Sequence, residues 1–136
     1  MKLENKQFFY IGTDTFQCDI GCFINYTPKE AVKYLKNKKR YQDLSQLIEK
    51  ACDVDNAEFD NDYIRGRMLP LDRGYCVFLK FYADSHRKNM SLVVHEMTHV
   101  VSWLLLDRRI ELSKNTDEVY AYLMESLMEQ FFNKWY

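Results

Sequence analysis

An apolar stretch of helix length, residues 91–107 (SLVVHEMTHVVSWLLLD), constrains the fold most, because three ionisable residues interrupt its interior. These residues are His95, Glu96 and His99. On an α-helix, residues four positions apart share one face and lie about 6 Å apart along the axis. The two imidazoles are therefore expected to reach one metal ion, with Glu96 beside them. The pattern is H-E-x-x-H, in which the glutamate acts as general base for metal-assisted hydrolysis.

A structural interpretation competes with this metal site, because a histidine on an apolar helix face is more often a core residue than a ligand. Burying all three groups without partners, however, would cost roughly several kcal/mol. The chain has only three histidines, and two of them occupy the motif. We therefore interpret His95 and His99 as ligands of Zn²⁺, which binds imidazole nitrogen at roughly 2.0–2.1 Å.

Length and charge limit the remaining possibilities. A chain of 136 residues, 47% hydrophobic, is expected to form one domain, residues 1–136, around one core. The formal net charge of −1 favours neither nucleic acid nor membrane as a partner. The first ten residues, MKLENKQFFY, carry charges where a signal peptide is apolar, so a cytoplasmic protein is expected. Its four cysteines are accordingly expected to be reduced.

Local patterns predict the elements around the motif. Residues 7–26 read as two strands joined by a turn, and residues 74–82 as the strongest strand. A helix is expected to start at Thr27, with Pro28 in its first position and Glu30 completing a capping box. The other expected segments are a short helix at 41–52, an irregular stretch at 63–73, a polar linker at 84–90 and a final helix at 115–135.

These elements predict an α+β fold. A small, mostly antiparallel sheet would form from the N-terminal strands and residues 74–82. The motif helix and the long C-terminal helix would pack across it and face each other at the metal. The strand at 74–82 would offer a free edge to an extended peptide.

A catalytic zinc needs a third protein ligand and an open position. His86 lies in the predicted linker and is a weak candidate. Glu118 is preferred, because it lies in the first turn of the last helix, where the helix dipole favours a carboxylate. An ordinary acidic residue at a helix start is the alternative explanation for Glu118. Glu125, two turns further on, is the substitute ligand or a group that orients a ligand histidine.

The residues at this point resemble a known family. H-E-M-T-H followed by N-T-D-E-V-Y-A-Y-L is similar to the gluzincin arrangement of thermolysin-type peptidases in a minimal form. More closely, it resembles small HExxH proteins encoded by tailed bacteriophages, over residues 75–127 well and 8–35 loosely. The resemblance implies a zincin-like fold and a zinc metallopeptidase, located in the host cytoplasm if phage-encoded. It also implies His95, His99 and Glu118 as ligands, with Glu96 as base.

The predicted reaction is hydrolysis of a peptide or protein substrate by zinc-activated water. Tyr122 is our candidate to stabilise the carbonyl oxygen, because it follows Glu118 by one helical turn. The alternative residues for this role are Tyr120, Tyr75 and His86. Peptide deformylase also uses HExxH, with a cysteine for which Cys76 is formally available, but that family's other segments are missing. The alternative function is a zinc-braced binding or structural protein, such as a phage particle component or a binder of a host protein.

Overall fold

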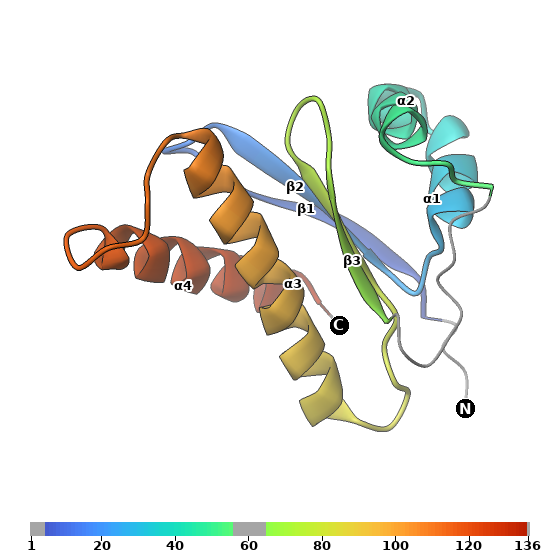
Figure 1. The fold of residues 1–136 in the computed structure, drawn as a ribbon. Coiled ribbons are helices and arrows are strands. Elements are labelled where there is room, and N and C mark those ends of the chain that lie inside the picture. Colours follow the sequence, from blue (N-terminus) through green and yellow to red (C-terminus); the bar gives the residue numbers. More distant parts are fainter. Residues whose placement is uncertain (1–4, 56–64, 136) are drawn as a thin grey trace.

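A four-stranded mixed sheet forms the middle of three layers in the computed structural model, which describes residues 5–55 and 65–135 (Figure 1). Its strands are β1 (Gln7–Thr13), β2 (Cys18–Ile24), β3 (Gly66–Pro70) and β4 (Tyr75–Leu79). They lie in the order β1-β2-β4-β3. The two outer pairs are antiparallel, whereas β2 and β4 run parallel. The expected α+β class is confirmed, and its sheet is mixed.

Helices cover both faces of the sheet. They are α1 (Pro28–Lys36), the short 3₁₀ helix η1 (Lys39–Tyr41), α2 (Gln42–Ala51), α3 (His86–Asp107) and α4 (Asp117–Lys134). The α1–α2 pair lies on one side, and α3 and α4 lie on the other (Figure 1). The motif helix α3 crosses the sheet at its β3 edge (Figure 1).

The start of α1 follows its local sequence. The Thr27 hydroxyl accepts a hydrogen bond from the Glu30 N–H, and the Glu30 carboxylate accepts one from the Thr27 N–H. Pro28 occupies the first helical turn, where its missing N–H is not needed. The predicted capping box is confirmed.

The sheet separates two apolar clusters because successive strand residues point to opposite faces. Toward α3 and α4, it contributes mainly aliphatic side chains: Ile20, Ile24, Val77 and Leu79. Toward α1 and α2, it contributes Phe23, Phe78, Leu69 and Cys76. The core therefore lies on both sides of β2 and β4, and these strands hold the two helical layers together.

Three predicted segments differ in the structure. Residues 66–70, expected to be irregular, form the edge strand β3. Its final residue, Pro70, has no N–H, which an edge strand tolerates. Residues 86–90, expected to be linker, are the beginning of α3. Strand β4 pairs with both β2 and β3, so the prediction that it offers a free edge is wrong.

Candidate functional site

Helix α3 divides the H-E-x-x-H residues between its two faces. Its buried positions recur at helical spacing and are Asn89, Val93, Glu96, Met97, Val100, Val101, Leu104 and Leu105. Glu96 belongs to this buried face and is only 4% exposed. His95 and His99 lie on the outer face and are exposed, so the competing interpretation of the two histidines as core residues does not hold. The carboxylate alone carries the cost of burial.

The two imidazoles face each other across one turn of α3. Their Nε2 atoms lie 3.3 Å apart, and their ring centroids lie 4.9 Å apart. Two nitrogen ligands at roughly 2.0–2.1 Å from a tetrahedral zinc ion are themselves about 3.3–3.4 Å apart. The spacing of His95 and His99 therefore fits two ligands of one zinc ion.

Glu96 is held against the β3 edge. Its carboxylate accepts a hydrogen bond from the Met68 N–H. Its Oε2 atom lies 3.9 Å from Nε2 of His95. Burial raises the pKa of Glu96, and His95, His99 and the Met68 N–H partly oppose that rise. A carboxyl with a raised pKa beside two imidazoles is a suitable proton acceptor near neutral pH.

Gly66 on β3 leaves the space that Glu96 occupies. A Cβ atom at this position would lie 2.8 Å from Oε2 of Glu96 and 2.6 Å from Cδ1 of Leu92. Both distances are shorter than van der Waals contact, so a larger residue would displace the carboxylate or Leu92. The glycine therefore leaves room on β3 for the side chains of Leu92 and Glu96.

The structure does not gather the predicted third ligand with the histidines. Glu118 lies in the first turn of α4, as predicted, and is exposed. Glu125 is also exposed. Over residues 5–55 and 65–135, no group of three or more His, Cys, Asp or Glu residues is arranged to hold a metal ion. The roles of Glu118 and Glu125 as ligands remain predictions.

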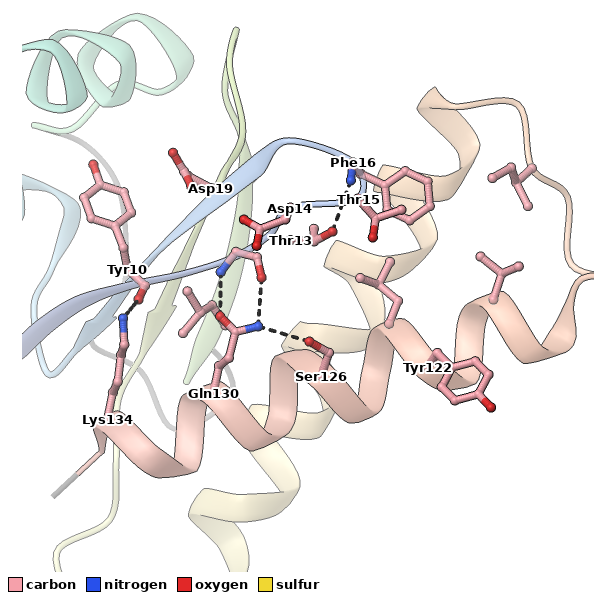
Figure 2. A pocket seen from close by; sticks show the side chains of 15 residues that line it. Tyr10, Thr13, Asp14, Thr15, Phe16, Asp19, Tyr122, Ser126, Gln130 and Lys134 are labelled. Atoms are coloured by element: carbon pink, nitrogen blue, oxygen red, sulfur yellow. Dashed lines mark hydrogen bonds between the residues drawn. The ribbon is translucent and has the colours of Figure 1, made fainter.

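Tyr122 lies at a different part of the surface. It is 67% exposed and lines a hollow between the β1–β2 turn and α4, together with Phe16, Ser126 and Gln130 (Figure 2). The lining of that hollow includes neither His95 nor Glu96. The proposed contact of Tyr122 with a substrate carbonyl also remains a prediction.

A separate pocket of about 500 Å³ adjoins His95 and Glu96. It lies between the first turns of α3 and the segments flanking β3 and β4, and it is lined by Arg65, Gly66, Tyr82, Arg87, Lys88, Ser91, Leu92, His95 and Glu96. Sequence reasoning missed its basic residues, which fall in stretches interpreted as irregular or as linker. One signal was present, because Arg87, Ser91, His95 and His99 recur every four residues, as on one helix face.

Comparison with known proteins places the chain in no family: no family model, curated protein or solved structure matches it. Within the part of the chain that the structure describes, no helix has the length and apolar character needed to cross a membrane. The chemistry of the site is therefore argued from its own residues.

Proposed function

We propose that this chain is a zinc-dependent metallopeptidase whose reaction centre is formed by His95, Glu96 and His99 on α3. The observation that supports this proposal is the facing pair of Nε2 atoms, 3.3 Å apart, with a buried carboxylate 3.9 Å from one of them. Nitrogen ligands with this separation suit zinc, and a raised-pKa glutamate suits proton transfer.

Each residue then has one role. His95 and His99 would hold the zinc ion, with Glu118 as the proposed third ligand and Glu125 as its alternative. A zinc ion bound there would act as a Lewis acid and would lower the pKa of its water to about 7. Glu96 accepts a proton from the attacking water and returns it to the leaving amine. Tyr122 is the proposed donor to the carbonyl oxygen.

The substrate is proposed to lie along β3. Among the described residues, this strand pairs only with β4. The Lys80 N–H bonds the Arg65 carbonyl, so antiparallel alternation turns the backbone groups of Gly66 and Met68 away from β4. The Met68 N–H on that side already donates to Glu96, so the Gly66 N–H and the carbonyls of Gly66 and Met68 are the groups proposed to pair with an extended peptide beside Glu96.

Hydrolysis is tested with zinc-loaded protein and a diverse peptide library, comparing wild type with Glu96→Gln. Glutamine keeps an oxygen that can accept from the Met68 N–H, so the fold is expected to survive while the base is lost. Cleavage by wild type should fall at least about 100-fold in the variant, the usual contribution of a general base. Glu111→Gln, the same change at an exposed site, is the control. Equal cleavage by wild type and Glu96→Gln would contradict the proposed base.

Zinc binding is tested separately by elemental analysis of protein purified without added metal. His95→Ala and His99→Ala should each lose zinc while keeping the thermal midpoint of metal-free wild type, because both side chains are exposed. Glu118→Gln and Glu125→Gln, measured in parallel, distinguish the two proposed third ligands. Zinc content unchanged in the histidine variants would reject the metal site.

A second function is favoured by the burial of Glu96. Its carboxylate ties α3 to β3 through the Met68 N–H, which is a bracing role that requires no chemistry. In that case the chain is a binding or structural protein. Glu96 would brace α3 against β3, and zinc at His95 and His99 would only add to this bracing. Zinc content does not separate the two functions, because both retain metal. Absence of cleavage by zinc-loaded wild type across the library would favour the bracing role.

A further inference from the structure

The pocket beside His95 and Glu96 is basic. Arg65 lies just before β3, and Arg87 and Lys88 lie in the first turn of α3. Against these three cations, the pocket lining contains one carboxylate, that of Glu96. Glu96 is buried at the inner end and already accepts a hydrogen bond from Met68. The outer part of the pocket therefore presents positive charge to an entering ligand.

Hydrogen bonds outside the pocket fix the position of its aromatic wall. The Asn89 side chain, which is 5% exposed, accepts from the Tyr82 N–H at 2.7 Å and donates to the Tyr82 carbonyl at 2.7 Å. This pair ties the segment after β4 to the first turns of α3. The Tyr82 ring is thereby held at the pocket, where two cations lie against it.

The cations are themselves positioned by the Tyr82 ring. The Arg65 guanidinium lies over this ring and donates to the Lys80 carbonyl at 3.0 Å. The Lys88 ammonium lies 4.9 Å from the ring centroid. Attraction to an aromatic face orients a cation without neutralising its charge. The Arg65 Nε is also buried without a hydrogen-bond partner among the described residues.

The N-terminal end of α3 adds to the positive electrostatic potential of the pocket. The N-cap residue Ser85 makes no side-chain capping bond, and the first turn contains no acidic residue. The N–H groups and dipole at a helix start attract anions. Four features thus converge on one hollow: an arginine–tyrosine stack, a lysine on the same ring, a further arginine and an uncapped helix start.

We propose that this pocket binds a carboxylate of the peptide substrate, next to the bond held at His95 and Glu96. The carboxylate belongs either to an Asp or Glu side chain or to the peptide C-terminus. The position of this subsite beside the reacting groups rests on the proposed peptidase function. Binding of the carboxylate itself does not require hydrolysis, so the two can be tested apart.

Binding is measured by fluorescence anisotropy on the full chain carrying Glu96→Gln, so that no peptide is consumed. The probes are acetylated, amidated neutral peptides with an uncharged fluorophore, in which one Glu is moved through the positions. A second probe set has no Glu and a free C-terminus. At low salt, the preferred carboxylate peptide should bind about fivefold or more tightly than its neutral counterpart, because charge-assisted pairs exceed neutral hydrogen bonds.

The variants locate the preference in the pocket. Arg87→Gln and Lys88→Gln, both at exposed positions, should each lower it about threefold or more, and Lys33→Gln on α1 should leave it unchanged. Preference for an internal Glu identifies a side-chain carboxylate, and preference only for a free C-terminus identifies the terminal one. Equal binding of charged and neutral peptides, or an equal effect of Lys33→Gln, overturns the proposal. If wild type still cleaves neutral peptides in that case, the peptidase function is supported and only the carboxylate subsite is rejected.

Discussion

At the residue scale, Glu96 combines two properties that usually exclude each other. It lies in the apolar face of α3, yet it carries a carboxylate, which accepts a backbone hydrogen bond from the Met68 N–H. One hydrogen bond compensates only part of the free energy of desolvating a charge. Because ionised Glu96 is costly to bury, the free energy of unfolding is expected to depend on whether Glu96 is ionised.

The first prediction concerns that dependence on pH. Burial raises the pKa of Glu96 above its ordinary value of 4.5, so the folded state holds the proton more tightly than the unfolded state does. The free energy of unfolding of metal-free wild type should therefore fall relative to Glu96→Gln as the pH rises from 4.5 through the raised pKa. Urea unfolding in a chelator at several pH values measures this difference, with Glu111→Gln as the matched control. A free energy of unfolding of wild type that stays constant or rises relative to that of Glu96→Gln over this pH range would contradict the prediction.

At the element scale, the free edge of β1 is covered by side chains of α4 rather than by another strand. Gln130 accepts from the Gly12 N–H at 3.0 Å and donates to the Gly12 carbonyl at 2.8 Å (Figure 2). Lys134 donates to the Tyr10 carbonyl on the same strand. An edge strand with unpaired backbone groups is a site of unwanted pairing, and these contacts satisfy part of that edge.

The second prediction tests this cover. Gln130→Met keeps a side chain of similar shape but removes both bonds to Gly12, leaving its N–H and carbonyl partly buried without those partners. The free energy of unfolding should fall by about 1–3 kcal/mol. The Gly12 amide should also exchange faster with deuterium. Ser126→Ala, which removes only the contact between Ser126 and Gln130, should change stability by less than about 0.5 kcal/mol.

Elements encoded by adjacent residues were predictable, and those that depend on distant partners were not. The start of α1 follows from Thr27, Pro28 and Glu30, which lie within four positions. Strand β3 was missed because Gly66 and Pro70 read as breakers. Its formation depends on pairing with β4, and the side chains of Leu92 and Glu96 lie in the space beside Gly66.

The site divides in the same way. His95, Glu96 and His99 form a local motif, so sequence alone brought them together. The pocket beside them combines Arg65 with Tyr82, which only the fold makes neighbours. Exposure also followed from packing, because spacing placed the histidines on one face without showing that this face is outward. The third ligand is a tertiary question of the same kind.

At the scale of the whole molecule, the two apolar clusters share strands rather than a common interior. Phe78 points toward α1 and α2, whereas its neighbours Val77 and Leu79 point toward α3 and α4. Loss of packing on one face is expected to loosen β4, against which the other face packs. The single domain expected from chain length should therefore unfold as one unit.

The last prediction tests that unity from the side far from the motif. Ile48 on α2 is fully buried in the cluster beneath α1 and α2. Ile48→Val should lower the free energy of unfolding by about 1 kcal/mol. For a chain of this size the thermal midpoint should fall by about 3–5 °C. Gln46→Ala, at an exposed position of the same helix, should shift the midpoint far less.

The chain provides its own reporter for this experiment, because Trp135 packs against the cluster on the opposite side of the sheet from Ile48. Trp135, just after α4, packs against Phe81 and Phe131, whereas the other tryptophan, Trp103 on α3, is half exposed. If the molecule unfolds as one unit, tryptophan fluorescence and circular dichroism shift together in Ile48→Val. A fluorescence transition that stays at the wild-type temperature would mean that α1 and α2 unfold independently. The H-E-x-x-H helix would then keep its packing without them.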